Sequence, residues 1–119
     1  MAKYERCFQG RFEEVLLFCE KVVMEGSLSS SFEDGSDFEY GGTRVAVRVY
    51  ERYSAIGGNR VSLNLTVVGN EQAICVSAIT SGGSQAMFWK INTWGEEAFL
   101  ETLSQSLDDF IEKNSGNIS

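Results

Sequence analysis

The chain begins with apolar residues that alternate with polar ones and then recur at helical spacing. Residues 4–8 alternate well enough to predict a short strand, which Gly10 ends. A helical period follows, with Glu13 and Glu14 in the first turn, where the helix dipole favours negative charge. The apolar face of this helix comprises Phe12, Val15, Leu16, Cys19, Val22 and Val23. Gly26, just past the last turn, predicts the end of the helix.

The next sixty residues have the pattern of an antiparallel meander. Gly41 and Gly42 accept the positive φ angles of a type I′ turn, which places Glu39 opposite Arg44 and Phe38 opposite Val45. The strand after this turn has two faces, one with Val45, Val47 and Val49 and the other with Arg44, Arg48, Tyr50 and Arg52. The serines at 29–31 and the Asp34-Gly35 pair predict a bulge in the strand before the turn.

Three further turns predict the register of the remaining strands. A loop at residues 54–60 pairs Tyr53 with Val61, and turns follow at 70–71 and 82–83. The expected pairs are Val49 with Leu65, Val47 with Val67, Leu65 with Val76, Val67 with Ile74, Ala78 with Met87, Val76 with Trp89, and Ile74 with Ile91. All these aliphatic residues then share one inner face, and a one-residue slip would invert a strand.

The last part of the chain returns to a helical period. Thr93 and Glu96 form a capping box. The apolar stripe that follows comprises Phe99, Leu100, Leu103, Leu107, Phe110 and Ile111. The pattern predicts one α+β domain over residues 1–113, with a frayed polar tail at 114–119. Its order is β-α-β(4-5)-α, an antiparallel meander sheet with two helices packed on one face. TBP-like and helix-grip folds share this topology, which by itself carries no function.

Charge and composition exclude several classes of function. The 119 residues include 17 Asp and Glu against 10 Lys and Arg, a formal net charge of −7. An acidic balance argues against nucleic-acid binding and against adsorption to an anionic membrane. The chain has no His, the commonest general base and metal ligand, and residues 34–37 lack the downstream ligands of a calcium loop. We therefore expect no metal, no cofactor, no nucleic-acid partner and no membrane partner.

The three cysteines, Cys7, Cys19 and Cys75, are an odd number with no close pair in the sequence. The N-terminal residues lack the apolar run of a signal peptide, and no stretch reaches transmembrane length. These features predict a cytoplasmic protein with reduced thiols. Cys7 and Cys19 fit packing positions, and Cys75 is expected on the outer face of the sheet.

Arg44, Arg48 and Arg52, here named the arginine row, are the only concentration of basic residues in the sequence. It predicts a small patch on the open sheet face that binds an anionic ligand or a partner. The candidate ligand-binding residues are Arg44, Arg48, Tyr50, Arg52, Asn64 and Ser77. An alternative interpretation is a solvated strand face on which Glu39 and Asp37 neutralise the arginines, since cross-strand pairs of this kind are common.

A group of apolar residues on the predicted outer face favours contact with another subunit. The candidate interface residues of a homodimer are Val68, Ala73, Ile79, Ala86 and Phe88. A single exposed apolar side chain is ordinary, whereas a contiguous group indicates an interaction site.

Several short motifs resemble an uncharacterised bacterial family of unknown function that occurs mainly in Firmicutes-type genomes. They are residues 49–53 (VYERY), 58–63 (GNRVSL) and 81–84 (SGGS), followed by Phe88 and residues 94–96 (WGE). The resemblance covers residues 44–100, with a weaker match over the first helix. It implies a small bacterial cytoplasmic protein and brings no activity or catalytic residues.

Two classes of function follow from these features. The first is a non-catalytic module that binds a small anionic or apolar ligand, or another protein. The second is a small enzyme or anion sensor that uses the arginine row with Tyr50, Glu51 or Cys75. The lack of any His, metal set or nucleophile motif favours the first.

Overall fold

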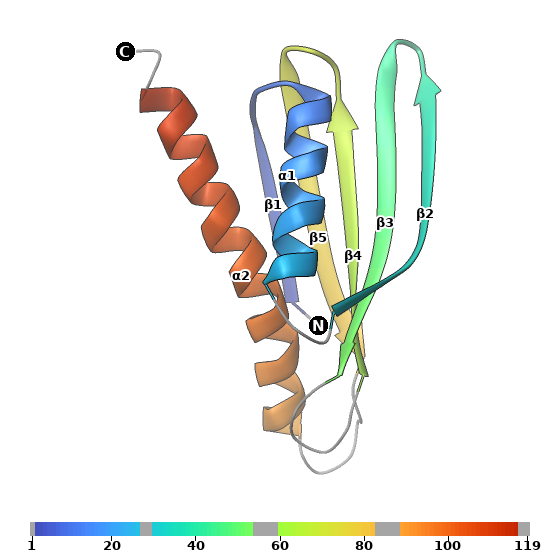
Figure 1. The fold of residues 1–119 in the computed structure, drawn as a ribbon, viewed down its shortest axis with the longest axis vertical. Coiled ribbons are helices and arrows are strands. Elements are labelled where there is room, and N and C mark those ends of the chain that lie inside the picture. Colours follow the sequence, from blue (N-terminus) through green and yellow to red (C-terminus); the bar gives the residue numbers. More distant parts are fainter. Residues whose placement is uncertain (1, 27–29, 54–59, 83–88, 117–119) are drawn as a thin grey trace.

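The computed structural model describes residues 2–26, 30–53, 60–82 and 89–116. The elements are β1 (Ala2–Gln9), α1 (Phe12–Glu25), β2 (Ser30–Tyr40), β3 (Thr43–Tyr53), β4 (Arg60–Gly69), β5 (Ala73–Gly82) and α2 (Trp89–Gly116). Both helices pack on the same face of a single sheet (Figure 1), and their apolar residues join those of the sheet in one buried cluster. The predicted α+β architecture is confirmed.

The sheet has five antiparallel strands in the order β1-β5-β4-β3-β2. Strands β2 to β5 form the predicted meander, and the N-terminal strand β1 pairs with the outer edge of β5. The predicted strand after Gly82 is therefore wrong, because β1 already occupies the edge with which that strand would pair. Trp89 and Ile91, expected to point inward from this strand, lie in the first turn of α2 instead. Met87 lies outside the described residues.

Helix α1 has the predicted bounds and the predicted apolar face. Its buried residues are Phe12, Val15, Leu16, Cys19 and Val23, with Val22 partly buried against them. The Gly26 N–H donates to the Val22 carbonyl over 2.8 Å and ends the helix. Because Glu13 and Glu20 are seven residues apart, they lie on the same side of the helix, two turns from each other.

Helix α2 packs through the predicted stripe. Phe99, Leu100, Leu103 and Leu107 are buried, and Phe110 and Ile111 are partly buried. The helix starts earlier than predicted, so Thr93 and Glu96 lie within it and do not cap it. It also continues to Gly116, beyond the predicted start of the tail. None of the helices in the described parts of the chain is long and apolar enough to cross a membrane.

The β2–β3 hairpin has the predicted turn and register. Gly41 and Gly42 have φ angles of 60° and 84°, the left-handed conformation that a type I′ turn requires. Phe38 lies opposite Val45, as predicted. The register of β2 shifts between Phe32 and Asp34, where the bulge was expected.

The β3–β4 register is one residue away from the prediction. Tyr53 pairs with Arg60, not Val61. Because side chains alternate along a strand, this single step inverts the faces of β3. Ala46 and Tyr50 are buried beneath the helices, and Val47 lies on the opposite face of the sheet. The prediction that the β3 valines point inward is therefore wrong.

The β4–β5 register is two residues away from the prediction, which keeps every side chain on the expected face. Leu65 lies opposite Ala78 and Val67 opposite Val76. The turn is closed by the Asn70 side chain, whose Oδ1 accepts the backbone N–H groups of residues 72 and 73 over 2.7 and 2.9 Å. An asparagine that bonds the backbone two residues ahead is typical of a tight turn.

Candidate functional site

The arginine row of β3 lies on the covered face, which is the face of the sheet beneath the two helices. Residues Arg44, Arg48, Tyr50 and Arg52 share this face with buried Ala46. The predicted placement of these four residues on the open face is wrong, because the register of β3 differs by one residue from the expected one. Asn64 and Ser77, predicted beside them, lie on the opposite face, so the structure divides the candidate ligand-binding set.

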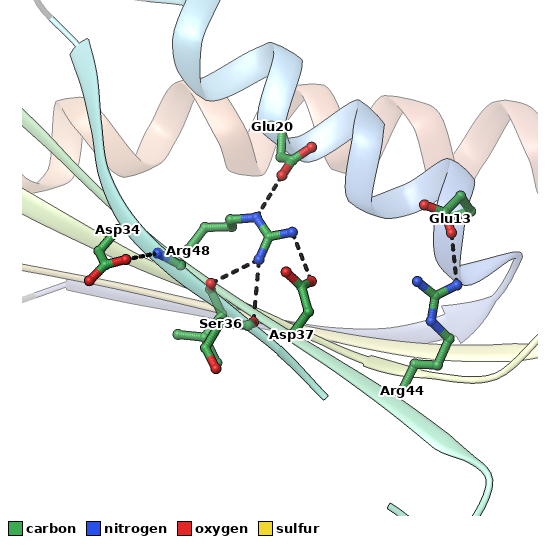
Figure 2. A network of polar contacts seen from close by, with 9 residues as sticks. Glu13, Glu20, Asp34, Ser36, Asp37, Arg44 and Arg48 are labelled. Atoms are coloured by element: carbon green, nitrogen blue, oxygen red, sulfur yellow. Dashed lines mark hydrogen bonds and ion pairs between the residues drawn. The ribbon is translucent and has the colours of Figure 1, made fainter. Parts of the chain in front are cut away.

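Arg48 is the centre of a polar network that joins three elements (Figure 2). Its Nε donates to Glu20 Oε2 of α1 over 2.7 Å, and its Nη2 donates to Asp37 Oδ1 of β2 over 2.9 Å. Its Nη1 donates to the carbonyls of Ser36 and Val47. The Arg48 side chain is only 12% exposed. All three guanidinium nitrogens therefore have acceptors within the protein.

The charges around Arg48 hold the guanidinium in its protonated form. Burial by itself would lower its pKa, but the bonds to Asp37 and Glu20 raise that pKa above the ordinary value. A buried cation with two carboxylate partners is a structural clamp between α1 and the outer hairpin. Binding of an external anion would have to compete with both carboxylates.

Arg44 is held in a similar way at the other end of α1 (Figure 2). Its Nη1 donates to Glu13 Oε2 over 2.7 Å, and its guanidinium carbon lies 4.4 Å from the centre of the Phe12 ring. The Arg44 side chain is more exposed than that of Arg48, so its ion pair is worth less.

Tyr50 and Arg52 lie farther along β3 on the covered face. The Tyr50 side chain is buried, and burial followed by the nearby Glu20 charge raises the pKa of its hydroxyl to about 12. The Arg52 guanidinium lies over the Phe99 ring of α2 at 4.7 Å, and burial lowers its pKa. Both side chains act as packing groups between the sheet and the helices.

A small cavity lies beside Arg52, between α1, α2 and the sheet. It is lined by Val22, Val23, Gly26, Arg52, Phe99, Thr102 and Leu103. Its volume of about 10 Å³ is that of one water molecule, which is far too small for a metabolite. The covered face otherwise carries the buried hydrophobic core.

No helix of the described residues lies over the opposite face of the sheet, here named the open face (Figure 1). Three rows of paired residues, here named rungs, cross all five strands on this face. The first rung is Lys3, Ile79, Asn64, Val49 and Asp34; the second is Glu5, Ser77, Thr66, Val47 and Ser36; the third is Cys7, Cys75, Val68, Val45 and Phe38.

Apolar side chains occupy the β3 row of the open face, whereas the central strand β4 carries Asn64 and Thr66 beside Val68. Val45, Val47, Val49 and Val68 are partly exposed, and the exposed fractions of Ile79 and Phe38 are 37% and 53%. The charged residues Lys3, Glu5 and Asp34 lie on the outer strands β1 and β2. Glu51 and Arg60 form an ion pair with each other at one end of the sheet.

The predicted interface set lies on the open face as far as the structure describes it. Val68, Ala73 and Ile79 are on this face, and Ala86 and Phe88 lie outside the described residues. The sequence interpretation missed Phe38 and the valines of β3. One signal in the sequence could have found them. The Arg44–Arg48 separation of about 13 Å along a strand nearly matches the Glu13–Glu20 separation of about 10 Å along a helix, which favours arginines that face α1.

Cys7 and Cys75 are bonded to each other as a disulfide between β1 and β5. The prediction of reduced thiols at these positions is wrong; it rested on the odd number of cysteines, on the lack of a close pair in the sequence and on the lack of an export signal. The pairing of β1 with β5 brings their Cα atoms to 4.0 Å. Cys75 is on the outer face as predicted. Cys19 is free and buried, and burial raises the pKa of its thiol to about 12.

A second polar contact fastens α2 to the edge strand β1. The Tyr4 hydroxyl donates to Asp108 Oδ1 over 2.6 Å, and Arg6 Nη1 donates to the same oxygen over 2.5 Å. Burial and this hydrogen bond raise the pKa of Tyr4 above its ordinary value. In the described residues, no three side chains of the Cys, Asp or Glu type are grouped so that they could hold a metal ion.

The comparisons with known proteins assign no activity to this chain. The chain belongs to a family of unknown function, DUF6054, which matches residues 1–111. That match includes both helices' buried stripes and all five strands. No similar protein is found among curated proteins.

Proposed function

We propose that this member of a family of unknown function is a non-catalytic protein-interaction module that binds its partner through the open face of the sheet. The observation that carries the proposal is the contrast between the two faces. The covered face is packed against the buried side chains of both helices, whereas the open face presents a row of valines that no helix of the described residues covers. A contiguous apolar group of this kind is typical of an interaction site.

The size of the open face supports this proposal. Five strands about 4.8 Å apart and about 26 Å long give a face of roughly 600 Å² on each molecule. Two such faces in contact would bury roughly 1,200 Å², the lower limit of a standard specific interface. The charged residues on the outer strands β1 and β2 also follow the usual anatomy of an interface, which has a polar rim.

We further propose that the protein forms a homodimer through this face. Light scattering coupled to size-exclusion chromatography tests both proposals. The wild-type protein should have twice the chain mass of 13.2 kDa, and Val47→Glu should be a folded monomer, since it puts a charge in the centre of the face. Leu17→Glu is the matched control. Leu17 is 59% exposed on α1, away from the sheet, so this variant should remain dimeric.

A wild-type protein that is strictly monomeric at high concentration would overturn the homodimer. A dimer that survives Val47→Glu would overturn the open face as the interface.

The alternative of a small enzyme or anion sensor has less support. Arg44 and Arg48 are bonded to carboxylates of α1, and the cavity beside Arg52 is too small for a ligand larger than water. A thermal-shift screen with inorganic phosphate and sulfate tests this alternative. A specific shift that Arg48→Ala abolishes would favour the anion sensor over the interaction module.

The bacterial origin and the cytoplasmic location stay predictions. The Cys7–Cys75 disulfide bears on the second of these, because disulfides persist mainly in oxidising compartments. Thiol labelling of the protein in its native cells would decide it. Labelling of Cys7 and Cys75 without prior reduction would support a reducing compartment.

A further inference from the structure

We infer that two copies of the chain stack open face to open face about a twofold axis that runs parallel to the strands, along β4. This inference rests on the proposed function, since it specifies the geometry of the homodimer. Because β4 is the central strand of five, such a rotation places β5 of one copy over β3 of the other, and β1 over β2. Each rung then lies over the same rung of the partner in reverse order.

The first rung supplies charge complementarity at both edges. Lys3 is at one end of this rung and Asp34 is at the other, so the rotation places the ammonium of each copy against the carboxylate of its partner. The symmetry makes two such pairs. Between them, Ile79 of β5 lies over Val49 of β3, and apolar surface meets apolar surface.

The other two rungs are also compatible with this stacking. In the second rung Glu5 lies over Ser36, so the carboxylate faces a hydroxyl and no like charge. In the third rung the Cys7–Cys75 disulfide lies over Phe38, an exposed ring that would gain a sulfur contact. Asn64, Thr66 and Val68 of β4 lie on the axis and face their own copies.

The alternative twofold axis, perpendicular to the strands, gives a poorer contact. It would exchange the first and third rungs and place each strand over its own copy. Glu5 would then face Glu5, and Asp34 would lie against Phe38 with no cation opposite. Like charges across an interface are unfavourable, so the charges select the axis along β4.

A charge exchange tests the edge contact. Lys3→Asp and Asp34→Lys each put like charges together twice in the dimer, and each should weaken dimerisation on the order of tenfold. The double variant restores opposite charges and should recover most of the wild-type dissociation constant. Both residues are exposed edge positions, and circular dichroism with thermal melting will show that the variants fold. Double-variant dimers as weak as the single variants would overturn the axis.

Cross-linking tests the axis itself. Cys19 is buried and the other two cysteines are bonded, so Thr66→Cys introduces the one accessible thiol among the described residues. With facing sheets about 10 Å apart, a short bismaleimide should link the two introduced thiols across the axis. Glu112→Cys, on an exposed position of α2, is the matched control and should remain uncross-linked.

The possible failures are distinguishable. A monomeric wild type would overturn both this geometry and the homodimer. A dimer that Val47→Glu abolishes, but that neither responds to the charge exchange nor cross-links through position 66, would overturn only the axis and leave the open face as the interface.

Discussion

The two faces of strand β3 carry residues that simple hydrophobicity would place the other way round. The face toward the helices carries Arg44, Arg48 and Arg52, and the face away from them carries Val45, Val47 and Val49. The arginines are accepted beneath the helices because α1 supplies Glu13 and Glu20 at matching positions. In addition, the guanidinium groups of Arg44 and Arg52 lie over aromatic rings. The lesson is that ion-pair partners on the opposite layer, and not hydrophobicity alone, decide which face of a strand is inside.

The valines on the open face follow from the same comparison. A strand that is buried on one face and solvated on the other usually carries polar residues on its solvated face. The open face of the sheet has such residues at Asn64 of β4 and Ser77 of β5. Three valines in alternation on the uncovered side favour the proposal that a partner covers this surface. The contrast between a filled covered face and an apolar open face is therefore the main argument for an interaction module.

The largest expected effect comes from a comparison on one strand, β4. Leu65→Ala should lower the free energy of unfolding by about 3 kcal/mol, because it leaves a cavity in the covered core. Val68→Ala, on the open face of the same strand, should lower it by less than about 1 kcal/mol in dilute monomer. Urea unfolding measures both values. Equal losses would mean that the open face is packed as a core within one chain.

The disulfide gives the next effect. Cys7→Ala together with Cys75→Ala should lower the free energy of unfolding by about 3 kcal/mol, because the bond closes a long loop between β1 and β5. A reducing agent should have the same effect on the wild type and none on the double variant. Indifference of the wild type to reduction would contradict a structural role for this bond.

Urea unfolding should also distinguish Arg48 from Arg44, two arginines of the covered face. Arg48→Ala should lower the free energy of unfolding by about 2 kcal/mol, since it leaves Glu20 without its cation in a partly buried site. Arg44→Ala should have a much smaller effect, because the Arg44–Glu13 pair is largely exposed. If the two variants were equally stable, the Arg48 network would not be the clamp described above.

The smallest effect is a pH dependence that arises on the covered side. Folding raises the pKa of Cys19 from 9.0 to about 12 and that of Tyr50 from 10.0 to about 12. A raised pKa means that the folded state holds the proton more tightly, so this stabilisation is complete below pH 9 and is lost as the pH rises toward 12. Between pH 9 and 10, Cys19 alone should account for a loss of about 1 kcal/mol. Urea unfolding at pH 9 and pH 10 should show that Cys19→Ala removes this loss in the free energy of unfolding. An equal loss in the variant and the wild type would contradict its assignment to Cys19.

The sequence predicted the elements of the fold better than their register. The helical stripes of α1 and α2 and the Gly41–Gly42 turn were identified correctly, because each depends on local periodicity or local backbone conformation. The β3–β4 register was wrong because the loop at 54–60 is too long for its glycines to determine the pairing. The strand expected after Gly82 was wrong because nothing local indicates that β1 pairs with β5. The same long-range pairing also hid the Cys7–Cys75 bond.

The one-residue register error between β3 and β4 also explains why the predicted ligand-binding residues lie on two different faces of the sheet. Asn64, Ser77 and Val68 were placed on the outer face correctly, since the two-residue error at the β4–β5 turn preserves the faces. The arginines were placed on the outer face wrongly, since the one-residue error at β3–β4 does not. The ion-pair partners of Arg44 and Arg48 are Glu13 and Glu20 of α1. The alternation of residues along β3 contains no information about this helix.

The most direct test of the two faces is methyl NMR of valine-labelled protein with a soluble paramagnetic agent, at low and high protein concentration. In dilute protein the agent should broaden the methyl signals of Val45, Val47 and Val49, and should spare those of Val67 and Val76. In concentrated protein the first group should become protected as the open faces meet. Signals of Val45, Val47 and Val49 that remain equally broadened at every concentration would contradict the account of the open face as an interface.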